Sequence, residues 1–272
     1  MLDKLWLIPV GFIVGTYGTL IGAGGGFVLV PMLLLFYPKE SPEVITSISL
    51  AVVFFNALSG SIAYIRLKRV DYHSGVLFAI ATIPGAILGA ITTSSIPRPL
   101  FDVFLGMLMI VGSLFLIFHA HKKPVWRKGE IPQCLVRNII EADGTTHTFS
   151  YSPILGIGLS LIVGYISSLL GIGGGIIHVP ALVHLLNFPV HVATATSHFI
   201  LAIMALTGTM VHIATGAFHH GIRRTIALAI GVLIGAQLGA LLSNRVGGIW
   251  IIRGLAIALG LVGIRILILA YA

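Results

Sequence analysis

The stretch Gly22-Ala23-Gly24-Gly25-Gly26 is followed by four apolar residues and Pro31, and the pattern returns as Gly171-Ile172-Gly173-Gly174-Gly175, followed by four apolar residues and Pro180. Each run comes after a long apolar segment and before a short one. Glycines do not continue a helix cheaply, and an unpaired backbone group in hydrocarbon costs several kcal/mol. Broken backbone at membrane depth is therefore buried in protein or lines a polar cavity. Paired interruptions in two halves of a chain indicate a transporter's binding site.

The composition identifies an integral membrane protein. Of the 272 residues, 57% are hydrophobic and 9% are charged, with a mean hydropathy of +1.06. Soluble domains carry roughly 25% charged residues. The net charge of +8 comes from Lys and Arg at the ends of apolar segments, which fits membrane orientation better than nucleic-acid binding. Cys134 is the single cysteine, so an internal disulfide is excluded.

Ten apolar segments are predicted to be helices. A span needs roughly 20 residues, and eight segments are long enough. The two that follow the glycines are too short to cross alone and are interpreted as half-helices. Leu5–Ile21 is interpreted as a permanent helix because no signal-peptide cleavage site follows it. The segments are 5–21, 27–37, 44–65, 75–95 and 99–119, then 153–170, 176–187, 191–216, 225–243 and 249–271.

The two halves, 1–119 and 153–272, are predicted to be internal repeats on either side of a polar linker, 120–152. The glycine runs match at an offset of 149, and Thr46-Ser47 matches Thr196-Ser197. The fold class is therefore an all-α polytopic membrane protein with two repeats of about four transmembrane helices each. Gly85/Gly89 and Gly235/Gly239 are small-xxx-small pairs, to which we assign only a role in helix packing.

Within the linker, Leu135–Glu141 and Thr145–Tyr151 flank Asp143-Gly144. This pattern predicts a β-hairpin with a two-residue turn at the membrane surface. We interpret the hairpin as a simple linker, and a regulatory role is the alternative.

The distribution of Lys and Arg predicts the orientation. With the linker in the cytoplasm, eleven of these residues lie inside and four outside, provided that each first segment and its half-helix together cross once. The halves are then parallel, and both termini are cytoplasmic. Counting each half-helix as a full crossing gives inverted halves and places Arg223 and Arg224 outside, so this arrangement is the less favoured alternative.

All eight carboxylates are predicted to lie in loops or near segment ends. Cation transporters and proton pumps usually keep an acidic residue inside the membrane, so this pattern favours an anionic substrate. Each half-helix begins directly after its glycines, and its free N–H groups and positive dipole end would face the break. Glycines also suit a tight bend or close packing, but their duplication favours a binding site.

Hydroxyl groups follow each half-helix, and His198 occupies a position in the second half where the first half has Ile48. A single hydroxyl usually bonds its own helix, so we assign function only to the matched pairs. The intramembrane histidines lack a metal-binding spacing and a nearby carboxylate, and no metal or cofactor is expected. The candidate substrate-binding residues are Gly22, Gly24, Gly25, Gly26, Thr46, Ser47, Asn56, Gly171, Gly173, Gly174, Gly175, Thr196, Ser197 and His198.

The doubled GxGGG-x4-P pattern, the Thr-Ser pairs and the basic hairpin linker resemble the TauE/SafE family, often called sulfite exporters. The resemblance covers nearly the whole chain. It implies export, or in some members import, of sulfur-containing anions such as sulfite, thiosulfate or sulfoacetate. It also implies that the glycines and the Thr-Ser pairs surround the pathway. Because the family shares these motifs, they do not select one anion.

We therefore expect a secondary transporter that exports a small sulfur-containing anion across a bacterial cytoplasmic membrane. No Walker motif is present, so ATP is not expected to drive it, and no nucleic-acid partner or enzymatic activity is expected. A passive anion channel, or a transporter of another small organic anion, is the alternative. Saturation and counterflow distinguish a transporter from a channel. An enzyme built on the histidines is a third class, which metal analysis would test.

Overall fold

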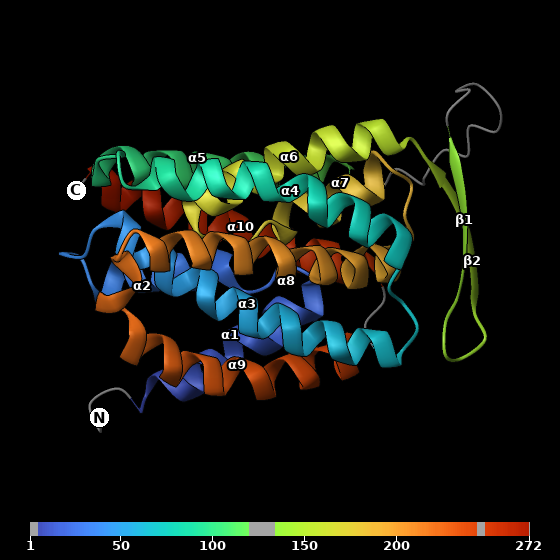
Figure 1. Ribbon diagram of the computed structural model, residues 1–272, viewed down its shortest axis with the longest axis horizontal. Helices are drawn as coiled ribbons and strands as arrows, with labels where there is room; N and C mark the ends of the chain where they lie inside the picture. The colour runs from blue at the N-terminus through green and yellow to red at the C-terminus, as the bar shows by residue number, and fades with distance from the viewer. Residues whose placement is uncertain (1–4, 120–133, 244–247, 272) are drawn as a thin grey trace.

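The computed structural model describes residues 5–119, 134–243 and 248–271. These ranges form ten α-helices, a short 3-10 helix and one two-stranded antiparallel sheet (Figure 1). The first half contains α1 (Leu7–Ile21), α2 (Gly26–Phe36), α3 (Pro42–Arg66), α4 (Tyr72–Thr93) and α5 (Arg98–His119). The hairpin strands are β1 (Leu135–Ile140) and β2 (Thr146–Tyr151). The second half contains α6 (Pro153–Leu170), α7 (Gly175–His184), α8 (Val190–Ala214), η2 (Ala217–His220), α9 (Ile222–Ser243) and α10 (Gly248–Tyr271).

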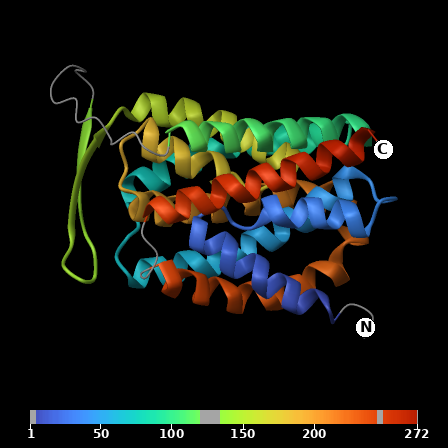
Figure 2. The same cartoon turned by 180° about the vertical axis from the view of Figure 1, so that it is seen from behind.

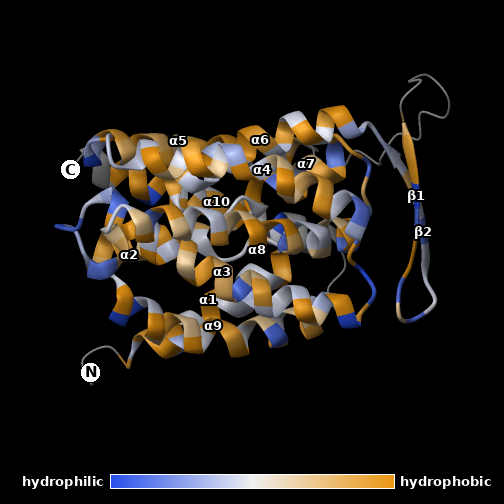
Figure 3. Cartoon of the chain, in the orientation of Figure 1, coloured by the Kyte–Doolittle hydropathy of each residue, from blue (hydrophilic) through white to orange (hydrophobic). Residues whose placement is uncertain are grey.

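The chain is a multi-pass membrane protein, as its composition predicts. In the described part of the chain, six helices are long and apolar enough to span a membrane: α3, α4, α5, α6, α8 and α9. Most strongly hydrophilic residues gather at the two ends of the bundle, while apolar residues cover the sides of the helices (Figure 3). This is the distribution expected for helices whose sides face lipid.

The bundle has two distinct ends, which lie opposite one another in Figures 1 and 2. The terminal end holds the start of α1 and the end of α10. There Arg98 donates to the carbonyl oxygen of Glu40 at 2.7 Å, and the hydroxyl of Thr215 donates to the Glu43 carboxylate at 3.3 Å. The hairpin end holds β1, β2 and the connections that pack against them. There Arg69, after α3, donates to Ser243 at the end of α9.

α1 and α2 form a re-entrant pair that enters and leaves the bundle at the terminal end. The ring of Trp6, just before α1, lies 5.0 Å from the ring of Phe36 at the end of α2. α6 and α7 form the second re-entrant pair, at the hairpin end. α6 begins directly after β2, and Phe188, just after α7, packs on Phe149 of β2 with ring centroids 4.3 Å apart.

These re-entrant pairs correct the predicted topology. Each half contains five helices in the predicted order, but α1, with 15 residues, is shorter than the predicted span, and each pair of a longer helix and a half-helix makes no net crossing. The chain reverses because the glycine loop turns back on α1, and α2 with its 11 residues then returns about 16 Å toward the terminal end. Three helices of each half, α3 to α5 and α8 to α10, run between the two ends (Figures 1 and 2).

The two halves consequently run in opposite directions, and the expectation of parallel halves is wrong. The start of α1 and the end of α10 share one end, while the hairpin lies at the other (Figure 1). The termini and the hairpin are therefore on opposite sides, not on the same side. Arg223 and Arg224, which weighed against inverted halves, begin α9 at the terminal end. Of the five linker cations in the charge count, four lie in 120–133, outside the described residues, and the fifth is Arg137 of β1.

The predicted hairpin is confirmed, but its turn differs by one residue. Ile140 pairs with Thr146, and the N–H of Glu141 donates to the carbonyl oxygen of Thr145 at 2.9 Å. This leaves Ala142, Asp143 and Gly144 as a three-residue turn instead of the predicted two-residue turn. Gly144 adopts the required left-handed conformation, with φ 87°. Ala142 is held outside the hairpin ladder because its N–H donates to the carbonyl oxygen of Leu67 at 3.0 Å.

Buried polar contacts anchor the hairpin to the bundle. Glu141 pairs with Arg69, and both side chains are less than 10% exposed. Arg137 donates to the fully buried carboxylate of Asp71 at 2.8 Å, and this hydrogen bond raises the pKa of Arg137 above its ordinary value. Tyr151 and Ser74 are also hydrogen-bonded. The hairpin is therefore a packed part of this end of the bundle.

The small-xxx-small pairs pack helices closely, as the sequence predicts. Gly235 and Gly239 of α9 lie against the backbone of α1, and Gly85 and Gly89 of α4 lie against the backbone of α6. A Cβ atom at any of these positions would collide with a carbonyl oxygen of the facing helix. The long helix of each re-entrant pair is thus held by a helix that crosses the bundle.

Candidate functional site

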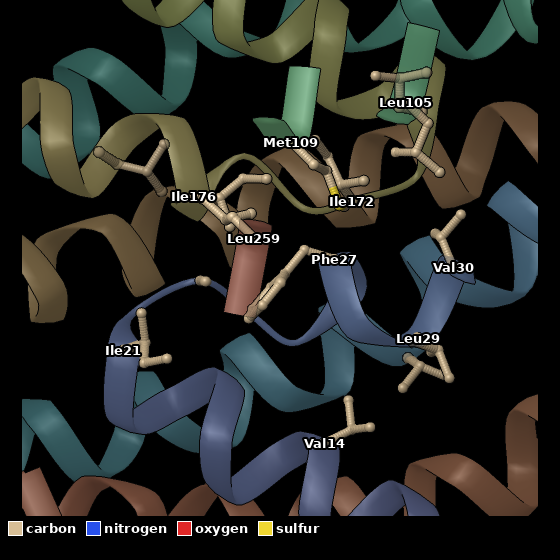
Figure 4. Close-up of a cluster of buried hydrophobic side chains, with 14 of the residues drawn as sticks. Val14, Ile21, Phe27, Leu29, Val30, Leu105, Met109, Ile172, Ile176 and Leu259 are labelled. Atoms are coloured by element: carbon tan, nitrogen blue, oxygen red, sulfur yellow. The ribbon is translucent and has the colours of Figure 1, made fainter. Parts of the chain in front are cut away.

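The two glycine loops meet at the centre of the bundle in direct backbone contact. A Cβ atom added to Gly26 would lie 2.6 Å from the carbonyl oxygen of Ile172, and one added to Gly175 would lie 2.5 Å from the Cα atom of Ala23. Only glycine leaves room for this crossing. Figure 4 shows the apolar shell around it, in which Phe27, Ile172 and Leu259 lie close together.

Most of the loop glycines have backbone conformations that disfavour other residues. In the first loop Gly22, Gly24 and Gly25 have φ values of 83°, 73° and 81°, and in the second loop Gly171 and Gly173 have 67° and 66°. L-residues rarely adopt this left-handed region. The loops differ at the residue before the short helix, because Gly174 has φ −44° where Gly25 has φ 81°.

The N-termini of both short helices meet at this crossing. In α2 the N–H groups of Val28 and Leu29 donate to the carbonyl oxygen of Gly25, at 3.1 Å each. In α7 the N–H groups of Ile177 and His178 donate to Gly174 at 3.0 and 2.8 Å. The N–H groups before these have no acceptor within their own helix. Two positive dipole ends and their N–H groups thus converge, an arrangement that suits an anion.

Hydroxyl groups from each half hold the glycine loop of the other half. Ser49 of α3 donates to the carbonyl oxygen of Gly171 at 2.6 Å, and Ser197 of α8 donates to that of Gly22 at 3.3 Å. Thr46 and Thr194, one turn earlier, pack directly on the same two glycines. These contacts place Thr46 at Gly171 and Ser197 at Gly22, so each of these candidate residues adjoins the glycine loop of the other half.

The structural match between the halves is Thr46/Ser49 with Thr194/Ser197, not Thr46-Ser47 with Thr196-Ser197. Ser47 donates to the carbonyl oxygen of Val44 in its own helix at 2.8 Å. Thr196 accepts a hydrogen bond from the backbone N–H of Asp71 at 3.1 Å. The hydroxyls of Ser47 and Thr196 are therefore engaged away from the loops. A Thr-x-x-Ser spacing, present in both halves, is the sequence signal for the observed match.

A buried polar cluster lies beside the first loop. The hydroxyl of Thr19 in α1 is 3.1 Å from Asn56 Oδ1 in α3 and 3.2 Å from His198 Nε2 in α8. The hydroxyl of Tyr64 donates to the carbonyl oxygen of Thr19 at 2.7 Å. All four side chains are 0% exposed. We call Thr19, Asn56, Tyr64 and His198 the first-loop cluster.

The other intramembrane histidines are engaged separately. His178 Nε2 is 3.2 Å from Ser160 Oγ, and His212 Nε2 is 3.4 Å from Thr46 Oγ1. No group of three or more His, Cys, Asp and Glu side chains that could hold a metal ion occurs within the described ranges. Sequence reasoning did not identify His212, Thr19 or Tyr64 as neighbours of the loops, because their partners come from distant helices.

The centre is closed in this conformation. Every residue from 21 to 27 and from 170 to 176 is buried. The acidic side chains of the described residues lie toward the two ends instead: Glu40, Glu43 and Asp102 at the terminal end, and Asp71, Glu141 and Asp143 at the hairpin end. The polar groups nearest the crossing are thus backbone groups, hydroxyls, an amide and a histidine, while Gly24 and Gly173 also face Val53 and Leu201.

Comparisons with known proteins identify the family and several relatives of this chain. Residues 7–266 match the family described as "Sulfite exporter TauE/SafE". YunE of Bacillus subtilis, named a probable membrane transporter protein, is 35% identical over 267 residues and 96% of both chains. A probable membrane transporter protein of Methanocaldococcus jannaschii is 23% identical over 96% of this chain and 94% of its own. One from Xylella fastidiosa is 27% identical over 87% of this chain and 82% of its own.

No solved structure matches this chain. The family match covers nearly its whole length, and the relative from Bacillus subtilis covers almost all of both chains. The protein therefore belongs to the TauE/SafE family of membrane transporters.

Proposed function

We propose that this member of the TauE/SafE family is a secondary transporter that exports a small sulfur-containing anion, such as sulfite, thiosulfate, sulfoacetate or a related organosulfonate. The observation that carries the proposal is the meeting of the N-termini of α2 and α7 at the closed centre of the bundle. Its substrate-binding residues are the loop glycines, with Thr46, Ser49, Asn56, Ser197 and His198 around them.

The chemistry of the centre favours an anion over a cation. The first N–H groups of α2 and α7 and the two dipole ends supply positive potential without a fixed charge. Among the described residues, no carboxylate lies near the crossing, and a buried cation would need one or more as partners. Arg98 and Arg224 are paired with carboxylates at the terminal end of the bundle, away from the crossing. The anion would therefore be held by neutral donors, from which it can also be released.

The two re-entrant pairs supply a route for alternating access. α1–α2 reaches the centre from the terminal end and α6–α7 from the hairpin end, so each loop closes the site toward a different side. Movement of one pair against the crossing helices would open the centre to one end while the other loop stays closed. Broken helices that meet at mid-membrane are the form that binding sites take in secondary transporters. Since the loops close by direct backbone contact, a permanently open pore is disfavoured.

Flux measurements with purified protein in liposomes test this proposal. Sulfite, thiosulfate, sulfoacetate, sulfate and acetate would be compared, with potassium as the cation control. We expect saturable flux and counterflow for at least one sulfur-containing anion, and faster exit when the lumen of right-side-out vesicles is negative. Flux that rises linearly with concentration without counterflow would favour a passive channel. Saturable flux of acetate alone would point to a transporter of another organic anion.

A further inference from the structure

We infer that the anion site is one-sided: Asn56, Thr19 and His198 form an oxyanion-binding subsite beside the first loop, and the second loop has no counterpart. This inference rests on the proposed function and specifies beside which loop the substrate is recognised. It follows from the hydrogen bonds of the first-loop cluster and from a comparison of the same places in the two halves.

The cluster has more donor hydrogens than acceptors to receive them. Asn56 carries two amide hydrogens, while Thr19 and a neutral His198 carry one each. The two hydrogen bonds that join these side chains use two of the four. In the structure the hydroxyl of Thr19 donates to Asn56 Oδ1. The Thr19 oxygen therefore accepts from His198 Nε2, and Asn56 Nδ2 is buried without a partner. If the chain of bonds ran in the other direction, the Nδ1–H of His198 would face the backbone of Gly22, and one amide hydrogen of Asn56 would still be left over.

Unsatisfied buried donors are rare in proteins because each one loses its hydrogen bonds to water. Here the three side chains that carry the unused donor hydrogens are held in place by the surrounding contacts. The hydroxyl of Tyr64 holds Thr19 by donating to the Thr19 carbonyl oxygen. The Tyr64 ring lies edge-on to the His198 ring, with ring centroids 5.7 Å apart. Asn56, Thr19 and His198 come from three different helices. An oxyanion would supply the missing acceptors, and hydrogen bonds to a charged group are the stronger kind.

The cluster adjoins the first glycine loop directly. Thr19 lies in the last turn of α1, three positions before Gly22. The ring of His198 lies beside the backbone of Gly22, to which Ser197 also donates. An anion seated at the crossing can therefore reach the amide of Asn56 once the loops separate.

The second loop has apolar side chains at the equivalent places. Gly60 of α3 faces His198 and Thr19, since an added Cβ atom would lie 2.5 Å from His198 Cδ2 and 3.0 Å from Thr19 Cγ2. Gly208 of α8 faces Leu50 and Ser168 in the same way, at 2.8 Å from Leu50 Cδ1. Leu50 thus lies beside the second loop where His198 lies beside the first.

By the same correspondence, Met204 of α8 takes the position of Asn56 in α3. Both residues lie four positions before the facing glycine, Gly208 in one half and Gly60 in the other. Ser168 replaces Thr19, and its hydroxyl has no partner. At the places of Asn56, His198 and Thr19 the second loop thus has a single hydroxyl and no amide. Its nearby imidazole, His212, takes the place of Tyr64 instead and lies 3.4 Å from the hydroxyl of Thr46. We therefore assign oxyanion recognition to the first-loop cluster.

Binding measurements on matched variants test the inference. Isothermal titration of the full-length protein in detergent would use sulfite, thiosulfate, sulfate and sulfoacetate as separate probes. We expect one anion bound per chain. Asn56→Leu should weaken binding at least tenfold, because a buried anion loses donors and gains nothing in return. Met204→Leu, the matched change beside the second loop, should alter affinity less than twofold.

Two further variants keep the test independent of misfolding. Asn56→Asp has the same shape but replaces the amide donor with a negative charge, so it should abolish binding in protein that elutes and melts like wild type. Ser168→Ala should leave affinity unchanged, whereas Thr19→Val should weaken it several-fold. Equal affinities for wild type, Asn56→Leu and Met204→Leu would overturn the one-sided site. Failure of wild-type protein to bind or transport any of the four anions would instead refute the proposed function.

Discussion

The two glycine loops make the same contacts with each other but have different surroundings. In both, a serine from the opposite half donates to the first glycine's carbonyl oxygen, and a glycine at the start of the short helix crosses the other loop. The first loop has Asn56 and His198 beside it, while the second has Met204 and Leu50. The loops also differ in backbone, since Gly25 is left-handed and Gly174 is not.

This difference separates what the loops share from what only one provides. The shared features are backbone contacts that close the centre, and they are needed wherever two re-entrant pairs meet. The unshared features are the amide of Asn56 and the imidazole of His198 beside the first loop, and these suit recognition. A transporter can use both loops as gates while only one carries the groups that select the substrate.

The largest expected effect concerns the direction in which each loop enters the membrane. In a Cys134→Ser background, single cysteines at Leu5 and Thr145 should be labelled by an impermeant reagent from opposite sides. A cysteine at His219, between α8 and α9, should behave like the one at Leu5. Labelling of Leu5 and Thr145 from one side would restore the parallel arrangement and remove the opposed entry of the loops. Detergent-permeabilised cells, in which all sites should react, provide the control.

The next effect concerns the backbone difference between the loops. Gly25→Ala places a side chain at φ 81°, which costs about 1–2 kcal/mol, and its Cβ atom would also lie 2.9 Å from the carbonyl oxygen of Val14. Gly174→Ala has an ordinary φ and meets only side-chain atoms of Val163, Ser167 and Met204. Gly25→Ala should therefore lower the melting temperature and the flux more than Gly174→Ala. Equal losses would show that the two backbones are equivalent in the working protein.

The smallest effect concerns the serines that hold the loops. Ser49→Ala removes a 2.6 Å hydrogen bond to Gly171 and should cost about 1 kcal/mol of stability. Ser197→Ala removes a weaker 3.3 Å bond to Gly22 and should cost less. Thermal melting in detergent would rank the two variants, with Ser47→Ala as a control for a hydroxyl that bonds its own helix. A larger loss for Ser197→Ala would mean that the first loop is the more tightly held.

Several elements could be predicted from the sequence because their causes are local. Apolar runs of membrane length predict helices wherever they occur, and glycines interrupt them wherever they occur. The helices α1 and α2, the break between them, and the strands β1 and β2 therefore begin and end within a few residues of their predicted bounds. Membership of the TauE/SafE family followed from the same local pattern and is shown by the family match.

The direction of the chain and the neighbours of each loop were decided only by the tertiary structure. An apolar segment interrupted by glycines, such as α1 and α2 together, can either continue across the membrane or turn back. The contact between Trp6 and Phe36 shows that it turns back. The partners of Gly22 and Gly171 lie on helices of the opposite half, far away in the chain. Composition and spacing report which residues can form hydrogen bonds, but the packing of helices from both halves determines which of them meet.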